Sequence, residues 1–127
     1  MSVYHSHKST LSNESSKSIL DALEAGNHEL LDLTFSATKL ANKDGMFGIS
    51  DPQLTVYIKN SDADKNAWKE IGKTEQIRNN LDPVFQTPIS VNYIFGVQQQ
   101  LKMVMHDIDG NEKEKIGSAT ISVAELL

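Results

Sequence analysis

Two aspartates near the end of the chain, Asp107 and Asp109, combine residue type and spacing in a way that suggests chemistry. They continue the alternation of Leu101, Met103 and Met105, which is the pattern of a strand with one apolar face. In extended backbone a period of two aims both carboxylates to one side. At ~4 Å and an effective dielectric near ~20 such a pair repels by roughly 4 kcal/mol, so a cation would stabilise it. Ligands that are all oxygen favour a hard ion, Ca²⁺ before Mg²⁺.

Two other interpretations of this stretch are open. The run Asp-Ile-Asp-Gly-Asn at 107–111 also fits a solvated turn, because Asp, Gly and Asn are ordinary turn residues. An EF-hand fits less well, since counting from Asp107 puts Glu112 at the glycine position and Ser118 at the bidentate glutamate position. The stretch that starts at Asp62 fails in the same way, with Ala67 at the glycine position.

Length and composition limit the classes of protein that fit. The 127 residues suit one small domain. Cysteine is absent, so disulfides and thiolate chemistry play no part. The net charge of −5 argues against a nucleic-acid binder and against constitutive attachment to anionic lipid. No stretch approaches the roughly 20 apolar residues of a membrane span, and no signal peptide is visible, so a cytoplasmic protein is expected.

The first 28 residues differ in composition from the rest. They are polar and rich in serine, without an apolar period, which predicts a disordered tail over 1–28. Within it, residues 18–26 could form one short helix with Ser18 as its cap and Gly26 as its stop. The folded domain is predicted over 29–127.

Alternation of apolar and polar residues predicts the antiparallel strands of this domain. The clearest is 31–38, where one face carries Leu31, Leu33, Phe35 and Ala37. Further strands are predicted over 54–59, 68–78, 84–93, 101–109 and 116–121. Gly72 is expected to mark a bulge, and Pro88 an edge position or a local bulge. Residues 122–125 resemble a capping box that opens a helical turn. A two-sheet sandwich normally needs one more strand after this turn, so the last strand is expected to be missing from this chain.

Counting the connections gathers the acidic residues at one end. If successive strands run antiparallel, the loops after the first, third and fifth predicted strands lie together. These loops bring together five carboxylates, which makes the solvated turn a poorer explanation than a metal site. The predicted ligands are Asp44, Asp51, Asp107, Asp109 and Glu114.

Four segments of the sequence form a recognisable set: Ile-Ser-Asp-Pro at 49–52, Trp-Lys-Glu-Ile-Gly-Lys-Thr-Glu at 68–75, Ile-Arg-Asn-Asn-Leu-Asp-Pro-Val-Phe at 77–85, and residues 101–109. Together they resemble the first C2 domain of a copine. The resemblance covers about 30–127. It implies an all-β fold, an antiparallel Greek-key β-sandwich (C2-like) of eight strands. It also implies Ca²⁺ as the cofactor, bound in loops at one end, and anionic phospholipid as the partner. Copines carry two such modules and a von Willebrand A-like domain.

The family pattern has five aspartate ligands, and this sequence matches four of them with Asp44, Asp51, Asp107 and Asp109. Glu114 stands where the fifth is expected, which predicts one full calcium site and a weaker second one. The positions that are often basic in phosphoinositide-binding C2 domains carry uncharged or acidic residues here, so that activity is not expected; they are Gln53, Thr55 and Glu75.

Three residues are predicted to contact a membrane. Met46 and Phe47 are apolar residues in an acidic loop, where insertion into lipid would explain them, although packing against the sandwich is the alternative. Arg78 is the candidate for a direct phosphate contact.

The function expected from the sequence is calcium-dependent binding to phosphatidylserine-like anionic membranes, with translocation from the cytoplasm to the plasma membrane or endosomes when calcium rises. Protein partners are possible as well. One alternative is a calcium-independent protein-interaction module with a vestigial metal site. An enzyme is not expected, because the sequence offers no credible nucleophile.

Overall fold

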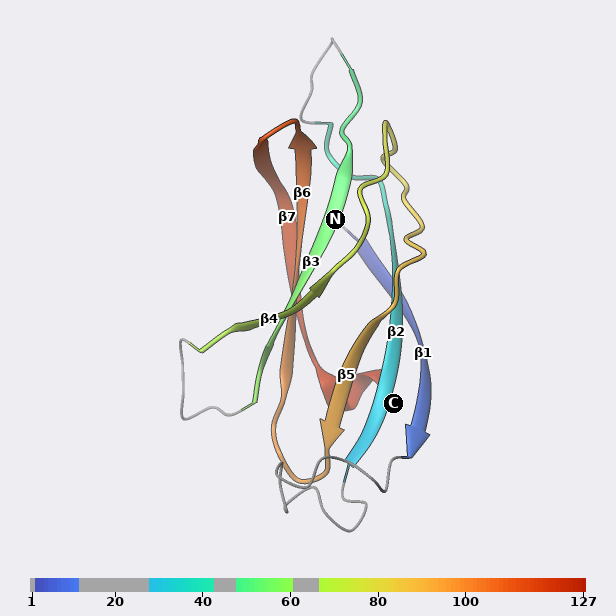
Figure 1. Ribbon diagram of the computed structural model, residues 1–127, viewed down its shortest axis with the longest axis vertical. Helices are drawn as coiled ribbons and strands as arrows, with labels where there is room; N and C mark the ends of the chain where they lie inside the picture. Colours follow the sequence, from blue (N-terminus) through green and yellow to red (C-terminus); the bar gives the residue numbers. More distant parts are fainter. Residues whose placement is uncertain (1, 12–27, 43–47, 61–66) are drawn as a thin grey trace.

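The computed structural model describes residues 2–11, 28–42, 48–60 and 67–127, and its strands form two antiparallel sheets that face each other (Figure 1). One sheet has the order β1-β2-β5, with β1 (Ser2–Leu11), β2 (His28–Thr38) and β5 (Ile89–Ile94). The other has the order β4-β3-β6-β7, with β4 (Lys69–Lys73), β3 (Pro52–Lys59), β6 (Gln100–Asp109) and β7 (Glu112–Ser122). The predicted all-β Greek-key sandwich is confirmed.

The core lies between the two sheets and follows the predicted alternation. Every second residue of β2 is buried, beginning with Leu31, and the same holds for alternate residues of β6, beginning with Leu101. Because side chains of a strand alternate between its faces, this pattern turns one face of each sheet inward. The short 3-10 helix η3 (Val123–Leu126) closes one end by burying Val123 and Leu126.

The predicted disordered tail is wrong for residues 2–11, which form the edge strand β1. The strand pairs with β2 along its whole length, from Ser2 opposite Thr38 to Leu11 opposite Glu29. Without it, that edge of β2 would present a row of unpaired backbone groups, and β1 satisfies them. Such pairing depends on backbone hydrogen bonds and so leaves little signal in a polar sequence. The short helix predicted at 18–26 lies outside the described residues.

Two predicted strands are shorter than expected. β4 ends at Lys73 because the next residue bonds differently: the N–H of Leu54 donates to the Thr74 hydroxyl at 3.0 Å. The bulge expected at Gly72 is confirmed by the register shift opposite Val56. The strand predicted at 84–93 is reduced to β5 and one isolated bridge of Val84 to Ser36.

The edge position of β5 and the C-terminal helical turn match the prediction. β5 is the end strand of its sheet, as expected from Pro88. The helical turn near the C-terminus forms, but the capping box is wrong because the Ser122 side chain makes no capping hydrogen bond. The described residues form seven strands, and the eighth stays a prediction.

Candidate metal centre at the loop end

Three connections meet at one end of the sandwich, as the strand count predicted (Figure 1). They are the segment before β3, the irregular segment between β4 and β5, and the β6–β7 hairpin. Backbone hydrogen bonds join the first two, from Ile77 N to Pro52 O at 3.0 Å and from Asn80 N to Ser50 O at 3.1 Å. A third backbone hydrogen bond, from Ile108 N to Asp51 O, joins the hairpin to the first segment, so the loop end is one connected structure.

Asp51 and Asp107 are in direct contact at this end. The N–H of Asp51 donates to Oδ1 of Asp107 at 2.8 Å, and the N–H of Ile108 donates to the carbonyl of Asp51 at 3.1 Å. Asp107 is only 3% exposed, so its carboxylate is held inside the loop end and not in open solvent. Two of the predicted ligands, 56 residues apart in sequence, are thus brought together.

Asn79 is a residue of this site that the sequence analysis missed. Its backbone N–H donates to Oδ1 of Asp51 at 2.6 Å. Its φ of 50° lies in the left-handed region, which asparagine tolerates better than most residues. With its side-chain amide turned toward Asp51, the amide nitrogen lies 3.2 Å from the same oxygen and 3.1 Å from Ile49 O. The Asn-Asn-Leu-Asp-Pro turn signal contained this information, but only the fold shows which carboxylate Asn79 contacts.

Asn42 fixes the ends of the first acidic loop. Its Nδ2 donates to the carbonyl of Gly48 at 2.9 Å, and its Oδ1 accepts from the N–H of Ser50 at 3.1 Å. The backbone that enters Asp51 is therefore held from both sides, because Asn42 braces Ser50 and Asn79 contacts Asp51 itself.

The β6–β7 hairpin sets the places of the remaining carboxylates. Its two-residue turn has Gly110 at φ 64°, the conformation that a type II′ turn needs at its first central position. The register then pairs Asp107 with Glu114 and Asp109 with Glu112. Directly opposed residues project to the same face of an antiparallel pair, so this end of the hairpin carries four acidic residues on one face. Glu112 was missed because a tight turn at 110–111 was not assigned from sequence.

The opposite face of the hairpin is basic. His106 is paired with Lys115, and Ile108 with Lys113. Burial lowers the pKa of His106, and the positive charges of Lys113 and Lys115 lower it further. The imidazole is therefore kept neutral near pH 7, so it adds no positive charge beside Asp107.

The predicted site residues fall into four groups. Asp51 and Asp107 are in contact, and Asp109 and Glu114 lie exposed on the hairpin. Arg78 is exposed next to Asn79. Asp44, Met46 and Phe47 lie outside the described residues. Within the described ranges no three His, Cys, Asp or Glu side chains are close enough together to hold a metal ion, so the full ligand set stays a prediction.

The fold and these loops define the class of protein. The family model described as "C2 domain" matches residues 33–127. The chain therefore belongs to the C2 domain family, which is a family of binding modules.

Similar proteins refine this class to the copines. The chain is 37% identical to Copine-A of Dictyostelium discoideum over 97 residues, which cover 76% of this chain and 16% of that protein. Copine-E of the same organism is 33% identical over 120 residues, 91% of this chain and 21% of that protein. The resemblance to a copine C2 domain is confirmed. The chain spans about a fifth or less of the length of these relatives.

Solved C2 domains share the fold at low sequence identity. A C2 domain of plant Extended Synaptotagmin 1 superposes with a TM-score of 0.59 at 22% identity, covering 78% of this chain and 70% of that chain. A calcium-bound structure of two C2 domains of Extended-Synaptotagmin 2 gives a TM-score of 0.54 at 22% identity, covering 72% of this chain and 32% of that chain. Separately, no helix among the described residues is both long and apolar enough to cross a bilayer.

Proposed function

We propose that this chain is a calcium-dependent phospholipid-binding C2 module of a copine-like protein. The observation that carries the proposal is the contact between Asp51 and Asp107, which joins two acidic segments from distant parts of the sequence. Burying a carboxylate against a second acidic residue is costly unless a cation or hydrogen-bond donors compensate it. Backbone N–H groups already donate to Oδ1 of Asp51 and of Asp107. The proposed cation would compensate the negative charge that these hydrogen bonds leave.

The chemistry of the donor set fits Ca²⁺. Asp51, Asp107 and Asp109 offer oxygen only, and Asp44 and Glu114 are proposed to complete the set. Each carboxylate has about four lone-pair positions, so one hydrogen bond to Oδ1 leaves capacity for a metal ion. Ca²⁺ accepts 6–8 oxygen ligands in adaptable geometry, which suits ligands from several loops.

The proposed switch is electrostatic. The carboxylates of the loop end repel an anionic membrane until their charge is neutralised. Ca²⁺ held by these carboxylates would supply further coordination positions for lipid phosphate and carboxylate oxygens. Arg78, exposed beside Asn79, is proposed to donate to a lipid phosphate. Met46 and Phe47 are proposed to enter the acyl boundary; Ile49, two residues on, is 42% exposed, which is consistent with an apolar loop tip.

A second candidate is a calcium-independent protein-interaction module. It is favoured by the lack, within the described residues, of any three potential ligands close enough to hold an ion. On either reading the chain acts by binding and not by catalysis. Movement from the cytoplasm to the plasma membrane or endosomes on a calcium rise is part of the first proposal only.

Cosedimentation with liposomes tests the two candidates. The chain is expected to sediment with phosphatidylserine vesicles in the presence of Ca²⁺ and to stay in solution when a chelator is added. Calorimetry without lipid should detect Ca²⁺ binding, and Ca²⁺ should raise the melting temperature because it binds the folded state. Absence of a Ca²⁺ heat at millimolar metal would favour the second candidate.

A further inference from the structure

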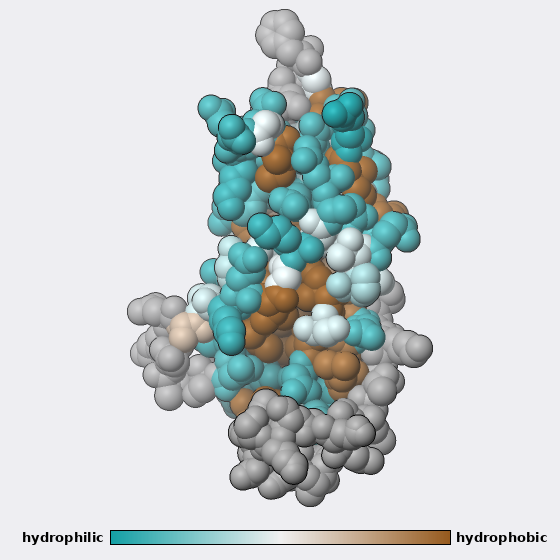
Figure 2. Space-filling model, viewed as in Figure 1, coloured by the Kyte–Doolittle hydropathy of each residue, from teal (hydrophilic) through white to brown (hydrophobic). Residues whose placement is uncertain are grey.

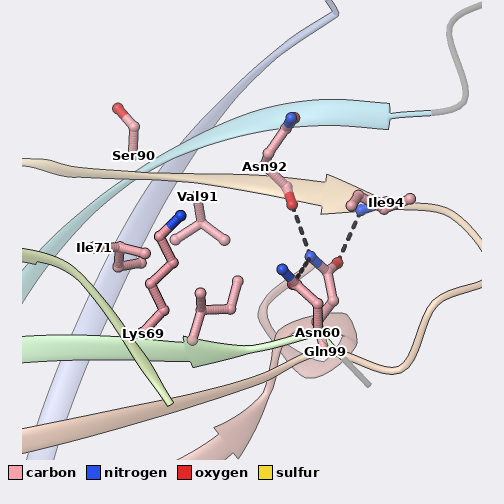
Figure 3. Close-up of a pocket in the computed structure, with 9 residues that line it drawn as sticks. Asn60, Lys69, Ile71, Ser90, Val91, Asn92, Ile94 and Gln99 are labelled. Atoms are coloured by element: carbon pink, nitrogen blue, oxygen red, sulfur yellow. Dashed lines mark hydrogen bonds between the residues drawn. The ribbon is translucent and has the colours of Figure 1, made fainter. Parts of the chain in front are cut away.

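A groove opens on the side of the sandwich where β4 and β5 run next to each other (Figure 3). Each of these is the end strand of its own sheet, so two sheet edges border the groove. Its volume is about 380 Å³, within the range of small binding sites. It lies away from the acidic loop end, and the proposed calcium switch does not use it.

At one end of the groove β4 and β5 touch, and at the other end Asn60 and Gln99 line it, joined by a hydrogen bond of 3.0 Å. A Cβ placed on Gly72 would lie 3.2 Å from Cγ2 of Ile89, so β4 and β5 touch there. From that contact the two strands diverge toward Lys69 and Ile94 (Figure 1). The result is a wedge whose walls are two strand edges.

The lining combines an apolar floor with one charge. Ile58, Ile71 and Val91 contribute apolar side chains, and Lys69 is the one charged residue among the described residues that line the groove. In Figure 3 the Lys69 side chain extends along Ile71 and Val91. Figure 2 shows apolar surface, in brown, on the lower half of the face that contains these strands. The groove therefore suits a ligand that is apolar and carries a negative charge.

The side-chain amide of Gln99 satisfies two backbone groups on the outer edge of β5. Its Oε1 accepts from the N–H of Ile94 at 2.8 Å, and its Nε2 donates to the carbonyl of Asn92 at 2.9 Å (Figure 3). A residue of a neighbouring strand presents one N–H and one C=O to this edge in the same way, so the Gln99 amide stands in for one such residue. The backbone N–H and C=O groups of alternate residues point to the same edge of a strand, so those of Ser90 lie on the same edge as those of Asn92. The opposite edge of β5 pairs with β2. Among the described residues, no hydrogen bond caps the rest of the outer edge, and it borders the groove.

We propose that the groove binds an extended peptide of a partner protein as an added strand on β5. The peptide backbone pairs with Ser90 and with the N–H of Asn92, whose carbonyl Gln99 already occupies. One apolar side chain packs on Ile71 and Val91, and an acidic side chain meets Lys69. Addition of a strand to an exposed edge is a known mode of peptide recognition, in which backbone bonds supply affinity and pockets supply specificity. The charge of Lys69 favours an acidic peptide over a neutral one.

A titration of the ¹⁵N-labelled chain, without calcium or lipid, tests this proposal independently of the calcium switch. The probes are two acetylated and amidated five-residue peptides, Thr-Val-Glu-Val-Thr and the same peptide with Gln in place of Glu. Amide signals of Ser90, Asn92 and Lys69 should shift, and the Glu peptide should bind about threefold more tightly, as for a partly exposed charge pair. In Lys69→Gln this preference should disappear. In the control Lys73→Gln, on the same strand but outside the groove lining, it should remain.

A second variant tests the backbone pairing. Ser90→Pro removes the N–H that faces the groove, and proline is tolerated on edge strands, so peptide binding should be lost while the β2 signals persist. The proposal is overturned if neither peptide shifts the groove signals at millimolar concentration, or if the shifts fall on Asp51 and Asp107. It is also overturned if Lys69→Gln keeps the preference for Glu. Shifts that depend on protein concentration alone would instead assign the groove to a second copy of the chain.

Discussion

The acidic loop end and the β4–β5 groove lie on the same sandwich but are built in opposite ways. At the loop end, hydrogen bonds between distant segments surround Asp51, including those to Asp107 and Asn79. In the groove, two sheet edges meet over an apolar floor, and a side chain, Gln99, takes the place of a strand. One region fixes its polar groups in advance, whereas in the other the described residues leave part of a strand edge uncovered.

This difference bears on how each region would bind. Groups held in place before a ligand arrives lose little further freedom on binding, which favours tight recognition of a small ion. An open strand edge gains backbone hydrogen bonds only when a partner adds to it, so it can accept sequences that differ in side chains. Variants of the loop end can test whether it is fixed in advance and used for calcium.

The largest expected effect is on calcium-driven membrane binding. Asp109→Asn removes one charge from an exposed residue that is proposed as a calcium ligand, so the apparent affinity for phosphatidylserine vesicles in calcium should fall by about a hundredfold or more, at roughly 1.4 kcal/mol per tenfold. Cosedimentation at increasing lipid concentrations measures it. The matched control is Glu125→Gln, an exposed acidic residue on η3, which should bind as the unmodified chain does. Unchanged binding in Asp109→Asn would remove the hairpin from the calcium site.

Phe47→Ala should weaken membrane binding with little change in calcium affinity. Loss of a buried aromatic side chain from lipid is expected to cost roughly 1.5–3 kcal/mol. The comparison is between vesicle cosedimentation and calcium calorimetry on the same variant. An equal loss in both assays would mean that the ring packs on the domain and supports the calcium loops.

The free energy of unfolding should depend more on Asp107, whose carboxylate is hydrogen-bonded, than on the exposed Asp109. Asp107→Ala leaves the N–H of Asp51 without its acceptor, which is expected to lower the free energy of unfolding by about 1–3 kcal/mol. Asp109→Ala, two residues on and exposed, should change it by no more than about 0.5 kcal/mol. Urea denaturation without calcium measures both. Equal effects would contradict the view that the loop end is held in place before calcium binds.

The smallest expected effect is at Glu75, which lies between the two regions. Its Oε2 accepts from Gln86 N at 2.7 Å and its Oε1 from Thr87 N at 3.1 Å, so it holds the segment that leads into β5. Burial raises the pKa of Glu75, but these hydrogen bonds outweigh it and leave the pKa below its usual 4.5. The folded state therefore favours the charged form, and its contribution is present above pH 4.5 and is lost as the pH falls through the folded pKa.

Glu75→Gln should accordingly lower the free energy of unfolding by about 1 kcal/mol near neutral pH. The difference from the unmodified chain should shrink below pH 4.5, because both side chains are then uncharged. Urea denaturation across this range measures it. Glu70→Gln, an exposed glutamate on β4, is the control and should show no such dependence. A difference that stayed constant with pH would assign the effect to packing.

Much of the fold could be predicted from local pattern. The alternation that begins at Leu31 marked β2, and that of Leu101, Met103 and Met105 marked β6, because a buried face imposes a period of two on the sequence. β1 could not be predicted in this way. Its place depends on the backbone edge of β2, and its polar residues carry no comparable period.

The candidate site was predicted in part. Counting antiparallel connections brought the segments of Asp51 and Asp107 to one end, and the two residues are in contact. The hydrogen bond from Asn79 to Asp51, and the pairing of Glu112 with Asp109, were not predictable. Both depend on turn geometry, a left-handed residue in one case and a two-residue hairpin in the other.

By itself, the sequence determined which residues are apolar and at what period, and therefore that two sheets would bury their inward faces. Only the tertiary structure decided which backbone groups meet across the chain, such as Asp51 with Asp107 and Gln99 with β5. The physical reason is that burial depends on one residue at a time, whereas a hydrogen bond depends on two. Burial acts on each residue according to its own side chain, whereas a hydrogen bond requires two specific atoms within about 3 Å, a condition that the folded chain alone can meet.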